Sequence, residues 1–227
     1  MKISYAVLSI LLILLVMHDI NAQDWPNLKE FSTANEALPE LKKNEQRVVF
    51  MGNSITIGWL QTHPAFFKDK PYINRGISGQ TTPQMLVRFR ADVIDLDAAA
   101  VVILAGTNDV AENTGPTTLE MIIDNLKSMT EIALANNVKV ILCSVLPAFD
   151  YPWRPGLNPN IKIPKLNAMI KAYAKEKDIY YLDYFKVLED GNNGMIKDYT
   201  YDGVHLNLKG SQFLEPILED AINTVLK

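Results

Sequence analysis

Short apolar segments rich in β-branched residues alternate along the chain with stretches whose apolar residues recur at helical spacing. An apolar run of about four to eight residues bounded by turn residues is typical of a buried strand. Five runs therefore predict five strands, although the second is short and partly polar. They lie at 47–51, 72–74, 99–104, 138–145 and 179–183.

Between these runs the apolar residues follow the period of an amphipathic helix. One apolar stripe covers 119–133 and another covers 213–225, and each predicts a helix with one face in the core. Thr82 followed by Pro83 also suits a helix start, because Thr can cap a helix and Pro fits its first turn. The segment 147–164 holds five prolines and is predicted to be a long loop.

Strands that alternate with helices, and that lack the apolar/polar alternation of a half-solvated sheet, favour a parallel sheet covered on both faces. We therefore predict an α/β fold, a three-layer α/β/α sandwich with a five-stranded parallel sheet. In such sheets ligands bind beyond the carboxyl ends of the strands. The residues just after each predicted strand are the ones to search for chemistry.

The N-terminus predicts a leader. Lys2 precedes an apolar run at 3–17, and a short polar stretch ends at Ala22, which is the order of a secretory signal peptide. The run is short for a membrane-spanning helix, which needs roughly 20 apolar residues. We expect a signal peptide over 1–22, a catalytic domain over 23–227, and a secreted or periplasmic protein without stable membrane insertion after leader removal. An uncleaved anchor is the alternative.

Length and charge limit the number of domains and the classes of partner that the chain can bind. The 227 residues suit one domain. The 22 basic and 26 acidic residues form no blocks, which argues against a nucleic-acid partner and favours a small or neutral substrate. Cys143, the single cysteine, excludes an intramolecular disulfide. It lies in an apolar strand and is predicted to be a core thiol rather than a nucleophile.

A serine follows the first predicted strand, in the segment Gly52-Asn53-Ser54-Ile55-Thr56. At a strand-to-helix turn its hydroxyl is exposed above the sheet, and amide N–H groups point at whatever it attacks. The segment differs from the G-x-S-x-G nucleophile elbow because Thr56 replaces the second glycine. Taken alone, this segment favours a serine that merely caps a helix.

Near the C-terminus, Asp202 lies three residues before His205. A carboxylate at this spacing can hold Nδ1 and leave Nε2 free to take a proton from a serine. The alternative is a turn aspartate beside a solvated histidine. His63 precedes Pro64 and has no carboxylate close before it, so it is a poor candidate base.

Two further turns offer hydrogen-bond donors for a developing oxyanion. Gly79 ends a turn after the second strand and can present its N–H to a substrate. Asn108 follows the third strand and can donate from its side-chain amide. Each turn is ordinary alone. Together the four turns supply a nucleophile, a base with its orienting acid, and oxyanion donors at one edge of the sheet.

These segments resemble the SGNH hydrolases, also called the GDSL-like lipase/acylhydrolase family. The resemblance covers the mature chain in order, with family blocks at 52–55, 74–81, 106–109 and 202–205. It implies a flavodoxin-like fold and a carboxylic ester hydrolase that needs no metal or organic cofactor.

The resemblance also assigns roles to residues. Ser54 matches the nucleophile, and Asp202 and His205 match the acid and the base. The N–H groups of Ser54 and Gly79 and the amide of Asn108 match the oxyanion hole.

One position departs from the family pattern, because Asn53 stands where an aspartate is usual. Asn53 keeps the shape and hydrogen-bonding capacity but removes a charge. Since this position is not the acid of the triad, we expect activity to be retained. If the carboxylate were needed to hold the nucleophile, the chain would be a non-catalytic, glycan-binding relative.

The leader and the resemblance to small secreted acetylhydrolases and carbohydrate esterases favour removal of short acyl groups, above all acetyl, from carbohydrates. In the proline-rich loop, Tyr151 and Trp153 are candidate platforms for a sugar ring, and Arg154 is a candidate contact for an acidic group. Alternatively, the aromatic residues only pin the loop. Lysophospholipase or thioesterase activity is the competing function. A metallophosphoesterase would need more clustered ligands than the histidines of this chain provide.

Overall fold

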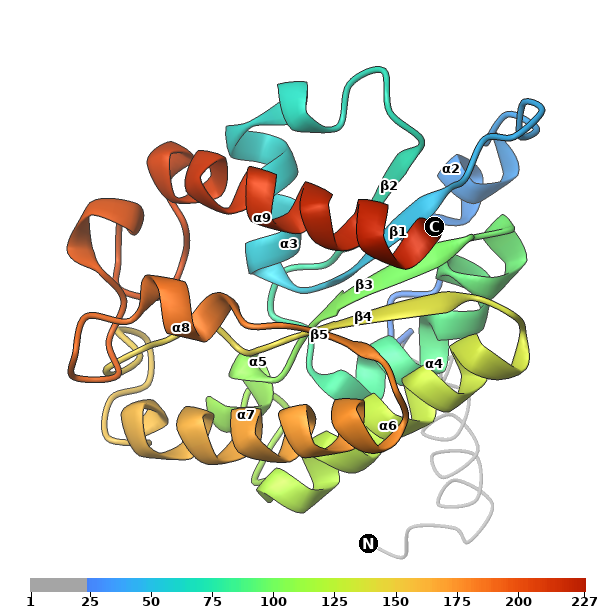
Figure 1. Cartoon of the computed structure of the whole chain (residues 1–227). Helices are drawn as coiled ribbons and strands as arrows, with labels where there is room; N and C mark the ends of the chain where they lie inside the picture. Colours follow the sequence, from blue (N-terminus) through green and yellow to red (C-terminus); the bar gives the residue numbers. More distant parts are fainter. Residues whose placement is uncertain (1–23) are drawn as a thin grey trace, which may run out of the picture.

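The sheet has five parallel strands in the order β2-β1-β3-β4-β5 (Figure 1). The computed structural model describes residues 24–227, so the predicted signal peptide lies outside the described residues. This strand order is that of flavodoxin-like folds, and the predicted fold class is confirmed. The strands are β1 (Val48–Gly52), β2 (Tyr72–Gly76), β3 (Ala100–Leu104), β4 (Lys139–Cys143) and β5 (Tyr180–Leu182).

Helices cover both faces of the sheet. In Figure 1, α3 and α9 lie above it, and α4, α6 and α7 lie below it. The predicted helices at 119–133 and 213–225 are confirmed by α6 and α9. The helices are α2 (Ser32–Glu36), α3 (Ser54–Thr62), α4 (Thr82–Asp92), α5 (Thr107–Val110), α6 (Leu119–Ala135), α7 (Pro159–Glu176), α8 (Tyr184–Leu188) and α9 (Leu208–Leu226). Short 3-10 helices cover Pro64–Phe66, Ile94–Leu96 and Lys197–Tyr199.

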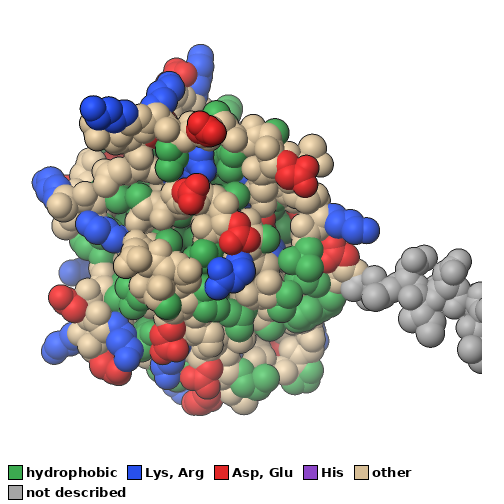
Figure 2. Space-filling model, turned by 90° about the vertical axis from the view of Figure 1, so that its right-hand side faces the viewer, with side chains coloured by type: hydrophobic (Ala, Val, Ile, Leu, Met, Phe, Trp, Pro, Cys, Tyr) green, Lys and Arg blue, Asp and Glu red, His purple; other side chains and the backbone are tan. Residues whose placement is uncertain are grey.

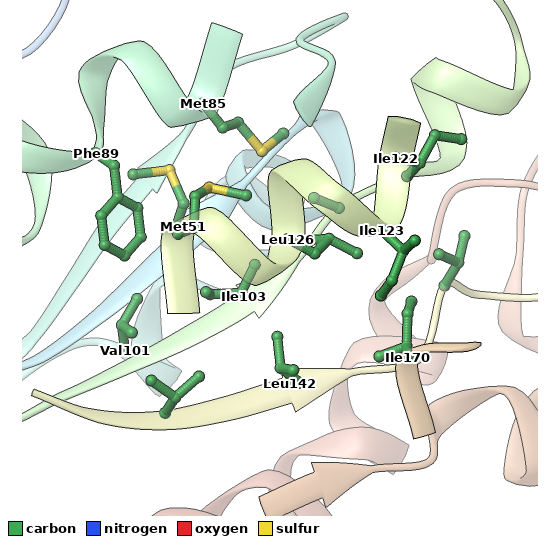
Figure 3. Close-up of a cluster of buried hydrophobic side chains, with 14 of the residues drawn as sticks. Met51, Met85, Phe89, Val101, Ile103, Ile122, Ile123, Leu126, Leu142 and Ile170 are labelled. Atoms are coloured by element: carbon green, nitrogen blue, oxygen red, sulfur yellow. The ribbon is translucent and has the colours of Figure 1, made fainter. Parts of the chain in front are cut away.

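The strands separate two hydrophobic cores. Met51 packs with Phe89 of α4 and Leu126 of α6 in one core (Figure 3). Phe50, the neighbouring strand residue, packs in the other core with Leu214 of α9. Because successive side chains of a strand point to opposite faces, both faces of β1 need apolar residues. This explains why the strand segments lack apolar/polar alternation.

The predicted strand ends are shifted by one or two residues, and the starts of α4 and α7 also differ from the prediction. The cap of α4 is Thr81, one residue before the predicted Thr82, and the Gln84 side chain accepts the Thr81 N–H. The proline-rich loop is shorter than predicted, because α7 begins at Pro159 and contains Pro164. Proline fits the first position of a helix, and the buried face of α7 outweighs the hydrogen bond lost at the internal proline.

On the face seen in Figure 2, basic and acidic side chains are interspersed, with apolar side chains between them. Within residues 24–227, each helix is too short or too polar to cross a bilayer.

Candidate active site

Ser54 begins α3 directly beyond the end of β1. Asn53 caps this helix, and its Oδ1 accepts the Ile55 N–H at 3.0 Å. The capping contact needs an oxygen but no charge, so asparagine performs it. Gly76 allows the turn to pack closely on the sheet, because a Cβ there would lie 2.8 Å from the Asn53 carbonyl oxygen. The local sequence thus places the Ser54 hydroxyl at the carboxyl edge of the sheet.

The structure brings the three predicted triad residues together. Ser54 Oγ lies 2.9 Å from His205 Nε2, and His205 Nδ1 lies 2.7 Å from Asp202 Oδ2. Burial raises the pKa of Asp202, but hydrogen bonds from the backbone and ring of His205 and from the Val204 N–H outweigh it and hold this pKa below its ordinary value. Asp202 is therefore a carboxylate at neutral pH, suited to orient the imidazole.

The turn before α9 fixes the position of His205. Gly203 has φ of 86°, a left-handed conformation that favours glycine. The Thr200 hydroxyl accepts the Gly203 N–H at 2.9 Å and donates to the His205 carbonyl at 2.6 Å. Asn207 then caps α9 by accepting the Gly210 N–H at 2.9 Å. The Asp-x-x-His segment is therefore a rigid turn anchored on the last helix.

The two predicted oxyanion turns lie beside the end of β1. The Ile77 N–H donates to the Gly52 carbonyl at 3.2 Å, which ties the turn of Gly79 to the strand that precedes Ser54. Gly79 has φ of 78°. Asn108 is buried in α5, and its Nδ2 donates one hydrogen to the Gln80 carbonyl at 2.9 Å. The amide nitrogen carries a second hydrogen, which has no acceptor among the described residues.

Residues 50–213 match the model of the GDSL-like Lipase/Acylhydrolase family. The chain belongs to this family. The predicted family is confirmed, and the protein is a carboxylic ester hydrolase.

Three relatives illustrate the similarity of this acylhydrolase to known proteins. A GDSL-like lipase from Bacteroides thetaiotaomicron has 50% sequence identity and a TM-score of 0.85, covering 88% of this chain and 98% of its own. The isoamyl acetate-hydrolyzing esterase 1 homolog of Bos taurus is 28% identical over 210 residues, 79% of this chain and 84% of the relative. An acetyl xylan esterase shares the fold, with 20% identity, a TM-score of 0.65, and coverage of 78% of this chain and 99% of its own.

Two exposed aromatic rings lie beside the imidazole of the acylhydrolase. The predicted Trp153 is 46% exposed, with its ring centroid 5.9 Å from that of His205. Tyr201 is 69% exposed and stacks on His205 at a centroid distance of 5.6 Å. The sequence analysis missed Tyr201, although its position directly before Asp202 was a usable signal.

The prediction that Tyr151 contacts a ligand is wrong. Its side chain has no exposed surface, and its hydroxyl donates to the Thr107 carbonyl at 3.0 Å. Tyr151 supports the Trp153 ring from below, with the two centroids 5.1 Å apart. It therefore pins the loop, as the alternative interpretation held.

Arg154 bridges two loops of the acylhydrolase. Its Nη1 donates to the Glu112 carbonyl at 2.6 Å, and its Nη2 lies 3.6 Å from the Glu112 carboxylate. Its contact with an acidic group of a substrate stays a prediction.

The other candidates from the sequence lie outside the triad. His63 pairs with Glu215 of α9. Cys143 is 2% exposed, and burial raises the pKa of its thiol, as expected of a core cysteine. Within the described residues, no three or more His, Cys, Asp or Glu side chains are grouped to hold a metal ion.

Asp109, next to Asn108, joins α5 to α4. Its carboxylate accepts the Thr82 N–H at 2.9 Å and the Thr82 hydroxyl at 2.6 Å. Burial raises the pKa of Asp109 from 3.8 to about 6, against the opposing effect of the Thr82 hydrogen bonds. The folded protein therefore binds this proton more tightly than the unfolded chain does.

This linkage predicts a pH-dependent effect of Asp109→Asn. Well below pH 3.8 Asp109 is protonated in both states. Between pH 3.8 and about 6 the unfolded chain ionises first, and the folded state must then ionise a buried group. The free energy of unfolding of the wild type should therefore fall, relative to the variant, by up to about 3 kcal/mol between pH 4 and 7. Urea unfolding at several pH values measures this difference. Parallel pH curves for the two proteins would contradict the assignment.

Proposed function

We propose that the protein is a serine esterase that removes short acyl groups, above all acetyl, from carbohydrates through an acyl-serine intermediate. The observation that carries the catalytic part is the chain of contacts from the Ser54 hydroxyl to His205 and on to Asp202, at 2.9 and 2.7 Å. This geometry suits proton transfer from the serine to the imidazole.

In the first half of the reaction, Ser54 Oγ attacks the ester carbonyl while His205 Nε2 takes its proton. Asp202 stabilises the imidazolium and stays ionised. The tetrahedral intermediate collapses when His205 returns the proton to the leaving alcohol, and the acyl group remains on Ser54.

In the second half, water replaces the alcohol. His205 takes a proton from the water, the resulting hydroxide attacks the acyl-serine, and the acid leaves as the proton returns to Ser54 Oγ. In both halves negative charge develops on the carbonyl oxygen. The N–H groups of Ser54 and Gly79 and the amide of Asn108 bind this oxyanion.

Two features support the proposed substrate. The Bos taurus relative is named for hydrolysis of isoamyl acetate, which favours acetyl as the acyl group. The exposed rings of Trp153 and Tyr201 beside His205 offer apolar faces on which a sugar ring can lie. Secretion directed by the leader at 1–22 is part of the same proposal and would bring the enzyme to extracellular or periplasmic glycans.

A series of p-nitrophenyl esters of rising chain length, run beside acetate release from acetylated oligosaccharides, tests the substrate. We expect the highest kcat/KM on acetyl esters and release of acetate from the glycans. A maximum on long acyl chains would instead favour the lysophospholipase or thioesterase alternative and leave the triad assignment intact.

Trp153→Ala tests the carbohydrate part. Loss of one stacking face should raise KM for an acetylated xylooligosaccharide about 5-fold, since such contacts contribute roughly 1 kcal/mol. The KM for p-nitrophenyl acetate, which lacks the sugar, should change less than about 2-fold. Leu134→Ala is the control, because Leu134 is an exposed apolar residue near the end of α6. Equal effects of Trp153→Ala on both substrates would argue against a sugar platform.

A further inference from the structure

Gln80 is a buried polar residue beside the proposed oxyanion hole. It is 2% exposed, and three of its polar groups are engaged. Its Oε1 accepts from Arg88 Nε at 2.6 Å, and its Nε2 donates to the Pro26 carbonyl at 2.8 Å. Its own carbonyl accepts from Asn108 Nδ2 at 2.9 Å. Gln80 therefore joins three separate parts of the chain at one point.

Arg88 anchors Gln80 to the sheet. The guanidinium is completely buried and donates to the Gly52 carbonyl at 3.2 Å and the Arg75 carbonyl at 2.8 Å. It also pairs with Asp92 at 2.9 Å. Gly52 ends β1, two residues before Ser54. Arg88 thus fixes the distance between the strand that bears the nucleophile and the turn that contains Gln80.

The N-terminal segment 24–36 anchors Gln80 from the other side. Besides the Pro26 contact, the Trp25 carbonyl accepts from Gln84 Nε2 at 2.7 Å. The Phe31 ring lies 4.7 Å from the Arg75 guanidinium. None of the residues of α2, which closes this segment, is buried. Asn35 of α2 also bonds to Arg75 and Asp92, so the segment is attached both through Gln80 and through residues around Arg88.

We propose that Gln80 is a positioning residue for the oxyanion hole, and that segment 24–36 contributes to catalysis by holding it. The proposal rests on the proposed oxyanion role of Asn108. With one amide hydrogen bound to the Gln80 carbonyl, the second hydrogen of Asn108 points in a fixed direction. If the carbonyl moves, the amide can rotate and present its own oxygen to the oxyanion, where it repels rather than stabilises the charge.

A double-mutant cycle between Gln80→Leu and Asn108→Ala tests the proposal. We expect Gln80→Leu to lower kcat on p-nitrophenyl acetate on the order of 10-fold to 10²-fold through misplacement of the amide, with KM changed less than about 2-fold. Asn108→Ala should lower kcat by about 10²–10³-fold. Because Gln80 acts through Asn108, the double variant should match Asn108→Ala alone. If the kcat losses of the two single variants multiply in the double variant, the proposal is overturned. Substitutions that act independently, for example on stability or packing, have additive effects on free energy.

Two more variants complete the test. Gln46→Leu is the matched control, because Gln46 is exposed and lies just before β1, at the end of the strand far from Ser54, and it should keep the wild-type kcat. Gln80→Glu keeps an oxygen toward Arg88 and removes the donor to Pro26. Gln80→Glu should also lower kcat, and its double variant with Asn108→Ala should match Asn108→Ala alone. It replaces Gln80→Leu in the test if the leucine variant fails to fold.

The remaining outcomes are also decisive. Wild-type kcat in folded Gln80→Leu or, where that variant does not fold, in Gln80→Glu would contradict the positioning role while the triad and Asn108 assignments stand. Wild-type kcat in Asn108→Ala would instead remove the proposed oxyanion role of Asn108, and positioning through it would be overturned as well.

Discussion

Ser54→Ala is expected to lower kcat on p-nitrophenyl acetate by about 10⁶-fold, the loss seen when the nucleophile of a serine triad is removed. The substitution deletes the oxygen that forms the acyl-enzyme and leaves a small residual rate from the oxyanion hole and substrate binding. Because His205 is the one hydrogen-bond partner of the Ser54 hydroxyl within residues 24–227, the fold should be unaffected. Initial-rate kinetics and thermal unfolding measure the two effects separately.

Covalent labelling gives an independent readout of the same residue. A fluorophosphonate should add one label to the wild type, detected by intact mass, and none to Ser54→Ala. Ser128→Ala is the matched control, because the Ser128 hydroxyl only donates to the Asp124 carbonyl within α6, at 2.9 Å. Equal labelling of Ser54→Ala and wild type would place the nucleophile elsewhere.

Asp202→Asn should produce the second largest loss, about 10⁴-fold in kcat. Asp202 Oδ1 accepts the N–H groups of Val204 and His205 at 2.9 and 2.8 Å, so an asparagine must place its oxygen there. Its NH₂ group then faces His205 Nδ1, which must become the acceptor. The ring proton moves to Nε2, the atom that faces Ser54 Oγ, and the imidazole can no longer take the serine proton.

Asp198→Asn is the control for this substitution. Asp198 lies near the same turn but is exposed, and its carboxylate pairs with Lys209 at 2.7 Å. Its kcat should stay within about 2-fold of the wild type, as expected for an exposed ion pair. Similar losses in both variants would indicate an effect of net charge. Full activity of Asp202→Asn would show that another group orients His205.

The sequence predicted the fold and the three residues that meet at the sheet edge, because both depend on local patterns. Strand runs separated by helical stripes specify the layers, and Ser54 and the Asp202–His205 pair each lie in a short segment beyond a predicted element. Residues of the loops were harder to predict. An aromatic residue in a proline-rich loop gives no sign of its burial, and the buried Tyr151 hydroxyl pairs with Thr107, 44 positions away.

Gln80 illustrates the same limit of local patterns. Its partners Pro26 and Asn108 lie 54 and 28 positions away, so its role depends on tertiary contacts. Pro164 misled the loop boundary for another reason. An internal proline usually ends a helix, but α7 continues through Pro164. Its buried face, with Ile163, Leu166 and Ile170, stabilises the helix.

The two aromatic rings beside His205 lie on loops, whereas the nucleophile and the Asn108 amide lie on helices at the sheet edge. Trp153 lies on the connection from β4 to α7, and Tyr201 lies on the irregular segment before α9, next to Asp202. Ser54 begins α3 after β1, and Asn108 is the second residue of α5 after β3. Mutagenesis libraries aimed at new esters can therefore diversify the connection from β4 to α7 and position 201, while Asp202, His205 and the sheet edge are left untouched. At Gly76, by contrast, even one methyl group would collide with the turn that carries the nucleophile.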